Sequence, residues 1–203
     1  MTAIQVIREM MESNRSLLLM LLEGLRHPSP TLALGALLHD VGKPPSFRVA
    51  DRIRFDGHVE AGVRLAHAIL ERLRFSGEET GRVETLVANH MKFQDLERMR
   101  ASTLKRFLRL PDFPDLLELH RLDCLASNGA LGNYELAKRK LEEIPGEELK
   151  PKPLVTGVDL IAAGYRPGPQ FSTMLAALEE AQLEGRVHSA GEALALVRDM
   201  FPQ

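Results

Sequence analysis

The sequence changes from apolar to polar within one stretch, Ala36-Leu37-Leu38-His39-Asp40-Val41-Gly42-Lys43-Pro44. A helical pattern that begins near Ser29 or Thr31 runs to about Asp40 and breaks at the glycine and proline that follow. Histidine and aspartate are costly at a buried helix end unless a partner satisfies them. A divalent metal is a common partner, because neutral imidazole and carboxylate are both good ligands. The stretch therefore predicts one corner of a metal site.

Helical periodicity dominates the rest of the chain, and no segment shows a convincing alternation of apolar and polar residues. The absence of tryptophan and the 5% aromatic content also favour helices over sheets. The predicted helices cover approximately residues 3–13, 16–26, 31–40, 58–74, 78–90, 102–110, 115–127, 134–143, 156–163, 170–184 and 189–201. We expect residues 42–55 to form a loop and Asp56 to cap the helix that follows. The predicted fold class is all-α.

A stretch rich in proline divides the chain unevenly. Pro145-Gly146 and Lys150-Pro151-Lys152-Pro153 interrupt the helical pattern, as linkers do. We predict a helical domain over residues 1–145 and a small helical tail over residues 150–203. Within the tail, Thr156-x-x-Asp159 and Ser189-x-x-Glu192 predict capping boxes, each at the start of a helix.

Composition narrows the classes of function. The 203 residues carry a net charge of -2, so the chain is no polycation that would bind nucleic acid through its overall charge. The single cysteine, Cys124, rules out an internal disulfide and fits a reducing compartment. No secretory pattern is present, and the first apolar stretch, residues 17–22, is too short to span a bilayer. We therefore expect a cytoplasmic protein without a membrane partner.

Five side chains form the candidate metal site: His39, Asp40, His58, His90 and Asp123. Two metal ions about 3.5–4 Å apart can share a bridging carboxylate and activate water for attack on phosphorus. Asp40 is the natural bridge, and His58 and His90 would complete the shell of one ion. His39 and Asp123 would serve the other ion. Lys43, one turn after Asp40, is expected to neutralise the charge of a substrate phosphate.

A structural alternative stands beside each of these assignments. His39 and Asp40 could cap the helix and hydrogen-bond each other, and the later histidines could be packed residues without a metal. Asp123 follows His120 by three residues on one helix face, so these two could form a buried polar pair. As part of a metal site, His120 suits a role in supporting a ligand better than a role as ligand.

An ordered series of stretches resembles the bacterial CCA-adding tRNA nucleotidyltransferase and poly(A) polymerase family. Four of them resemble its HD region: residues 36–44, Gly57-His58-x-x-x-Gly62, Leu86-Val87-x-x-His90-Met91 and residues 117–127. Three resemble its C-terminal tail: residues 150–154, 164–169 and 178–185. The resemblance covers roughly residues 15–201. It implies an HD-type helical bundle, a link to tRNA, and a metal-dependent phosphohydrolase or phosphodiesterase site.

Two departures from the family pattern matter. The polymerising head of the family needs a Gly-Ser loop and an Asp-x-Asp pair, and this sequence has neither. We therefore expect no nucleotide addition by this chain alone, and a separately encoded head is a candidate partner. HD domains also supply an earlier histidine, and Asn14 or Arg15 stands at that position. Arginine cannot bind a metal, which weakens the ion that His39 and Asp123 would hold.

The remaining ligands predict one ion per chain. Two histidines and one carboxylate suit Mn, Ni, Fe or Zn. Arg15 could take over the charge of the lost ion and bind a phosphate.

Two functions stay open at this point. The first is a metal-dependent phosphohydrolase or phosphodiesterase that acts on a nucleotide or an RNA end. The second is a non-catalytic tRNA-binding, RNA-binding or assembly module. A basic cluster of Lys105, Arg106 and Arg109 is either a solvated helix face or, as the resemblance implies, a contact to the phosphate backbone of RNA.

Overall fold

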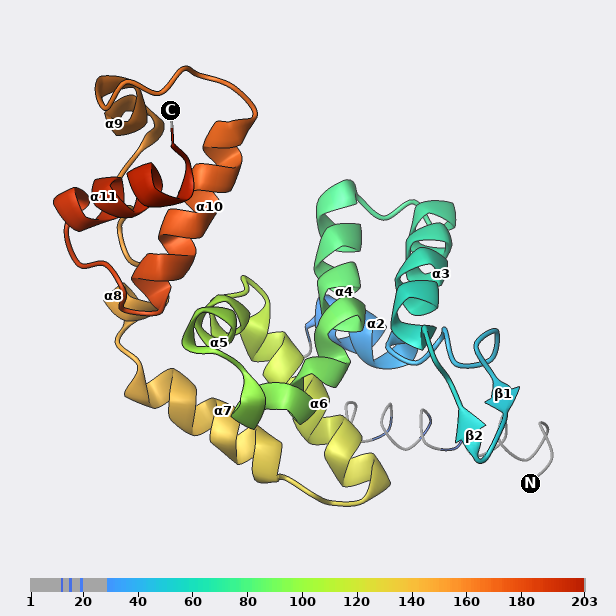
Figure 1. Cartoon of the computed structure of the whole chain (residues 1–203). Helices are drawn as coiled ribbons and strands as arrows, with labels where there is room; N and C mark the ends of the chain where they lie inside the picture. The colour runs from blue at the N-terminus through green and yellow to red at the C-terminus, as the bar shows by residue number, and fades with distance from the viewer. Residues whose placement is uncertain (1–11, 13–14, 16–18, 20–28, 203) are drawn as a thin grey trace. The chain divides into compact units, whose positions relative to one another are not determined.

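The computed structural model describes residues 12, 15, 19 and 29–202 of the chain (Figure 1). The helices predicted over residues 3–13 and 16–26 lie almost wholly outside the described residues. Helices dominate the described part, and the all-α prediction is confirmed. None of the helices described combines the length and the apolar character that a membrane crossing requires.

The chain packs as two units. Unit 1 comprises residues 1–96 and 111–139, and unit 2 comprises residues 97–110 and 140–203. The main elements of unit 1 are α2 (Pro30–Leu38), the hairpin of β1 (Arg48–Val49) and β2 (Ile53–Arg54), α3 (His58–Arg72), α4 (Gly77–Asn89), most of the 3-10 helix η1 (His90–Arg98) and α6 (Phe113–Ser127). The helix α7 (Gly132–Glu143) begins in the residues of unit 1.

Helix α2 packs against α4 and α6 in unit 1. Ser29 caps its N-terminus, because the Ser29 hydroxyl accepts the backbone N–H of Leu32 at 3.3 Å. The same hydroxyl donates to Asp115 of α6 at 2.7 Å. Gly35 lies so close to α4 that an added Cβ would sit 2.5 Å from the Leu86 side chain. Ser29 thus fixes the N-terminus of α2, and the close approach at Gly35 holds the helix against α4 about one turn before His39.

Helices α3 and α4 lie side by side and complete the core of unit 1. The buried residues of this cluster are Leu38, Ala66, Leu70, Val83 and Val87. A capping box begins α4, with Ser76 and Glu79 exchanging side-chain and backbone hydrogen bonds. This box was not predicted, although Ser76-x-x-Glu79 is its usual pattern.

Two details of residues 42–58 differ from the sequence prediction. The expected loop contains an antiparallel hairpin in which β1 pairs with β2, with Val49 opposite Ile53. Strands of two residues are too short to show an alternating pattern. The N-cap of α3 is Gly57 with φ of 77°, so the prediction that Asp56 caps this helix is wrong. A left-handed backbone at that position favours glycine, and Asp56 instead faces Arg48 at 3.8 Å.

Unit 2 has its own core. Its helices are α5 (Ala101–Leu108), α8 (Gly146–Leu149), α9 (Gly157–Ala162), α10 (Gln170–Leu183) and α11 (Ala190–Met200). Its buried cluster contains Val155, Leu160, Tyr165, Met174, Leu178, Ala181, Val187, Ala193 and Val197. The capping box of Thr156 and Asp159 is confirmed. The second box is only half formed, because Glu192 accepts the N–H of His188 instead of that of Ser189.

The structure groups residues 97–110 with the C-terminal residues, whereas the predicted first domain, residues 1–145, included them. The backbone N–H of Ser102 donates to Glu184 at 2.8 Å, and Lys105 donates to the carbonyl of Leu183 at 3.2 Å. These partners lie about 80 residues apart in the sequence. Contacts of this kind leave no local pattern, and so the sequence could not indicate where α5 packs.

Candidate metal centre

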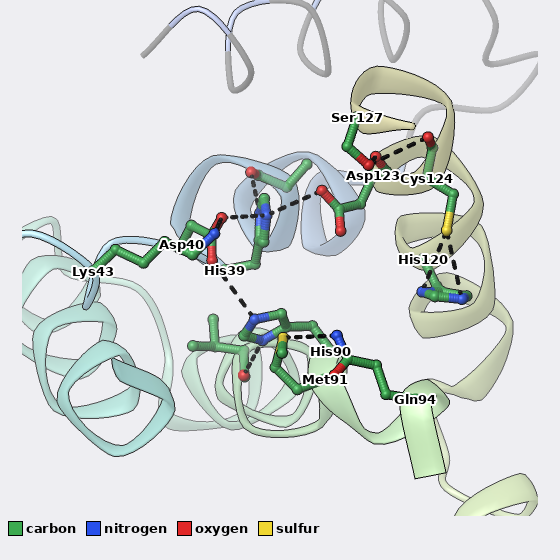
Figure 2. A network of polar contacts seen from close by, with 12 residues as sticks. His39, Asp40, Lys43, His90, Met91, Gln94, His120, Asp123, Cys124 and Ser127 are labelled. Atoms are coloured by element: carbon green, nitrogen blue, oxygen red, sulfur yellow. Dashed lines mark hydrogen bonds and ion pairs between the residues drawn. The ribbon is translucent and has the colours of Figure 1, made fainter. Parts of the chain in front are cut away.

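Three helix ends converge in unit 1, and Figure 2 shows the residues at two of them, His39 with Asp40 and His90. His39 is the C-cap of α2 and Asp40 follows it, His58 begins α3, and His90 is the C-cap of α4. One ligand atom from each of Asp40, His58 and His90 lies within 4.8 Å of the other two. The tertiary structure therefore brings together residues that are up to 50 positions apart in the chain.

Backbone carbonyls fix the orientation of the three histidine rings. Each ring places Nδ1 against the carbonyl three residues earlier: His39 on Ala36 at 2.9 Å, His58 on Phe55 at 2.9 Å and His90 on Val87 at 2.7 Å. A carbonyl only accepts, so Nδ1 carries a proton in each ring, and in a neutral ring whose Nε2 has no other partner, as at His58 and His90, Nε2 keeps its lone pair. Most histidines that bind a metal through one ring nitrogen donate the N–H of the other ring nitrogen to a carbonyl, a carboxylate or water, and this bond orients the ring.

The Nε2 atoms of His58 and His90 are buried and have no hydrogen-bond partner among the described residues. An unpaired buried polar atom costs about 1–3 kcal/mol, so a folded chain usually satisfies it. A divalent cation would satisfy both atoms together with the nearby carboxylate of Asp40. Two imidazoles and one carboxylate are a donor set that fits a transition metal.

The carboxylate of Asp40 has different partners on its two oxygens. Oδ1 lies 3.7 Å from Nε2 of His90. Oδ2 lies 3.3 Å from Nε2 of His39 and contacts the ammonium of Lys43. Burial alone would raise the pKa of Asp40, but the hydrogen bond to His39 and the charge of Lys43 hold it well below its usual range. The carboxylate is therefore ionised at neutral pH, as a metal ligand must be.

The environments of the two buried histidines shift their pKa values in opposite directions. Burial lowers the pKa of His39, but Asp40 more than compensates, so that the pKa is raised above its ordinary value. For His90, burial and then the neighbouring His39 lower the pKa to about 4. His90 is therefore neutral at pH 7 and has a lone pair available for a metal.

Helix α6 contributes Asp123, which points toward His39, and His120, which lies beside Cys124 (Figure 2). Oδ1 of Asp123 is 3.7 Å from Nε2 of His39, and burial raises the pKa of this carboxyl group. The ring of His120 stacks on Phe93 with centroids 4.1 Å apart, and its Nε2 is 3.6 Å from Sγ of Cys124. His120 thus faces the aromatic core, and its role in supporting a ligand stays a prediction, as does metal binding by His39 and Asp123.

The position of the missing histidine is only partly described. Arg15 is helical and exposed, whereas Asn14 lies outside the described residues. The prediction that Arg15 binds a phosphate is therefore untested.

A pocket of about 830 Å³ opens beside the three ligands. Its lining includes Asp40, Lys43, His58 and Asp123, and the hairpin and η1 supply further residues, among them Arg52, Arg54, Phe55, Met91, Gln94 and Asp95. Sites for small molecules have volumes of about 300–1,000 Å³. The pocket is thus large enough for a nucleotide-sized ligand next to the candidate metal position.

Two residues that shape the site were missed as functional positions in the sequence. Phe55 holds His58 through its carbonyl, and its ring lies 5.8 Å from the ammonium of Lys43. Gly42 packs directly on α3, because an added Cβ would lie 2.0 Å from the carbonyl oxygen of His58 and 2.5 Å from the amide of Gly62. In the sequence, Gly42 and Gly62 lie in two of the stretches that resemble the HD region, and these glycines could have indicated a close contact. Nothing in the sequence singled out Phe55.

The basic cluster predicted to contact RNA is partnered within unit 2. Glu179 accepts from Arg109 at 2.5 Å and from Arg106 at 3.2 Å. Lys105 lies 3.3 Å from Glu148. These ion pairs give the three cations a role in holding α5 to α10 and α8, and contact to phosphate stays a prediction.

The sequence model of the family described as "HD domain" matches residues 8–125. The match covers more than half of the chain, which therefore belongs to the HD domain family. All three residues that converge on the candidate metal position lie inside the matched range.

The chain is also similar to tRNA nucleotidyltransferases. It is 40% identical over 169 residues to a CC-adding tRNA nucleotidyltransferase of Thermus thermophilus, covering 81% of this chain and 38% of the relative. It is 37% identical over 188 residues to an A-adding tRNA nucleotidyltransferase of Deinococcus radiodurans, covering 85% of this chain and 43% of the relative. The chain thus spans about two-fifths of the length of these relatives, and the expected family relationship is confirmed.

Proposed function

We propose that this chain is a metal-dependent phosphohydrolase or phosphodiesterase that acts on a nucleotide or an RNA end. The observation that carries the proposal is the convergence of Asp40, His58 and His90 with two buried, unpartnered Nε2 atoms. Helix packing alone gives no reason to bury two such atoms side by side. The adjoining pocket supplies the space for a substrate.

The chain's own residues have distinct tasks in this proposal. Asp40, His58 and His90 would hold the ion, and the carbonyls of Phe55 and Val87 keep the two rings in the required orientation. When bound, a transition metal polarises a phosphoryl oxygen and lowers the pKa of water to near neutrality. Lys43 lines the same pocket and would neutralise charge on a substrate phosphate.

Elemental analysis of the purified protein tests the proposal. We expect about one transition metal per chain in the wild type and a loss of that metal in Asp40→Asn, which keeps the size of the side chain. Asp199→Asn is the matched control, because Asp199 is an exposed residue of α11 in unit 2, and it should keep the metal. Hydrolysis of a generic phosphomonoester or phosphodiester should follow the metal content and stop when a chelator is added.

Metal-free wild-type protein that fails to take up Mn, Ni, Fe or Zn on reconstitution would overturn the proposal. Metal uptake without hydrolysis of phosphomonoesters or phosphodiesters would remove the enzymatic part and leave a metal site.

The second candidate is a non-catalytic tRNA-binding or assembly module that partners a nucleotidyltransferase head. The similarity to tRNA nucleotidyltransferases favours it, since it spans 169 to 188 residues and so reaches beyond the part matched by the HD domain. This function predicts affinity for tRNA that falls steeply with salt and that Asp40→Asn leaves unchanged. Filter binding at two salt concentrations would measure both properties.

A further inference from the structure

Lys43 and His39 both approach the same oxygen of Asp40. Oδ2 contacts the ammonium of Lys43 and lies 3.3 Å from Nε2 of His39. Oδ1 is the oxygen that faces His90, at 3.7 Å. One carboxylate thus presents one oxygen to the candidate metal position and the other to two nitrogen groups of the chain.

We infer that Lys43 acts as a resident cation in the place of a second metal ion, so that the centre holds a single ion on the Oδ1 side of Asp40. The inference rests on the metal site of the proposed function. A second ion would have to bind Oδ2 of Asp40 together with His39 and Asp123. The Lys43 ammonium already neutralises that oxygen, and two cations on one oxygen repel each other.

The surroundings of Lys43 keep its ammonium near Asp40. Its side chain is only 27% exposed, and its Nζ lies 5.8 Å from the centre of the Phe55 ring, a favourable cation–π distance. Phe55 also holds His58 through its carbonyl. The same residue therefore positions a ligand of the bound ion and the cation that excludes a second one.

The remaining residues on the Oδ2 side are arranged as a set of ligands without an ion. Nε2 of His39 lies between the two carboxylates, 3.3 Å from Asp40 and 3.7 Å from Asp123. Removal of the ammonium would leave two carboxylates and one imidazole around this position. We therefore expect the loss of Lys43 to create a second, weaker metal site.

Titration with Mn²⁺ tests this inference through stoichiometry and the electron paramagnetic resonance spectrum, neither of which depends on hydrolysis. We expect one ion per chain in the wild type and in Lys43→Arg, which keeps the charge. Lys43→Met should bind about two ions per chain and show the magnetic coupling of a close Mn²⁺ pair. Lys138→Met, at an exposed position of α7, is the control and should bind one ion.

A single ion in Lys43→Met, or two ions in the wild type, would overturn the inference. Asp123→Asn provides an independent arm should Lys43→Met fail to fold. The wild-type ion should survive Asp123→Asn, because it is bound on the Oδ1 side, whereas loss of that ion would contradict the inference.

The outcomes also separate this inference from the proposed function. The expected stoichiometries without any hydrolysis would remove the phosphoesterase and keep the assignment of Lys43. No Mn²⁺ in any variant would overturn the assignment of Lys43, and it would overturn the proposed function as well only if Ni, Fe and Zn also failed to bind.

Discussion

Two clusters of charged and polar side chains, one in each unit, differ in how fully their atoms are satisfied. In unit 1, Nε2 of His58 and Nε2 of His90 are buried without a hydrogen-bond partner among the described residues. In unit 2, Arg106 and Arg109 both bind Glu179, and Lys105 binds Glu148 and a backbone carbonyl. The sequence predicted a binding function for both clusters, but the structure shows unpartnered buried atoms only in the cluster of unit 1 among the two.

The difference shows how a binding site can be distinguished from a structural ion-pair network. Partly exposed ion pairs that are fully partnered add modest stability and leave no atom in need of a ligand. Buried lone pairs without a partner cost free energy that folding alone does not recover. Unit 1 therefore holds the candidate centre, whereas the cluster of unit 2 serves the packing of α5.

The largest effect should come from Gly42→Ala in unit 1. The added methyl group would lie 2.0 Å from the carbonyl oxygen of His58, so α3 must move away from the end of α2. Overpacking of this kind costs about 1–3 kcal/mol or more. We expect thermal unfolding at a clearly lower temperature and loss of the bound metal, since Asp40 and His58 would separate.

Gly81→Ala is the matched control for that substitution. Gly81 lies within α4, and an added Cβ would meet nothing within 4 Å. Alanine at such a helical position should stabilise the protein by about 0.4–1 kcal/mol. Equal unfolding temperatures for the two variants would contradict the role of the contact between Gly42 and α3.

The pH dependence of stability should also depend on unit 1. Burial lowers the pKa of His120 to about 4, whereas an unfolded chain has a value of about 6.5. Between these values the unfolded state binds more protons, so stability is full above about pH 6.5 and falls as the pH drops toward 4. This pKa shift corresponds to a stability difference of about 3 kcal/mol.

Urea unfolding of the wild type and His120→Phe between pH 7 and pH 4 would measure this contribution. Phenylalanine can keep the stacking on Phe93 but takes up no proton, so the variant should lose less stability on acidification. Some pH dependence should remain, because His90 is shifted in the same direction. Identical slopes for both proteins would show that His120 contributes nothing.

The smallest effect is expected from the ion pairs of unit 2. A double-mutant cycle with Arg109→Ala and Glu179→Ala should give a coupling of about 0.2–1 kcal/mol, the usual range for partly exposed pairs. Lys140 and Glu143, a more exposed pair on one helix, should give about 0.3–0.5 kcal/mol. Free energies of unfolding from urea titrations supply all terms.

A negligible coupling between Arg109 and Glu179, together with loss of tRNA affinity in Arg109→Ala, would contradict the conclusion that the cluster of unit 2 is structural. The cluster would then be a phosphate-binding surface instead of a packing contact.

Local patterns predicted much of the fold. The apolar periodicity identified α3, and the capping box of Thr156 and Asp159 marked α9. Local patterns failed at two places in the fold. The hairpin was missed because its strands have two residues each, and α5 was placed with the wrong neighbours because its partner α10 lies about 70 residues further along.

The sequence by itself determined the helical fold class, the family relationship and the identities of the candidate ligands. These follow from residue type and spacing, which are local properties of the chain. Only the tertiary structure decided that ligand atoms of Asp40, His58 and His90 lie within 4.8 Å of one another. It also decided that Lys43 contacts one oxygen of Asp40. The partners of the basic cluster, Glu148 and Glu179, were likewise visible only in the structure. The physical reason is that distances between side chains depend on how helices pack, and packing depends on contacts between residues far apart in the sequence.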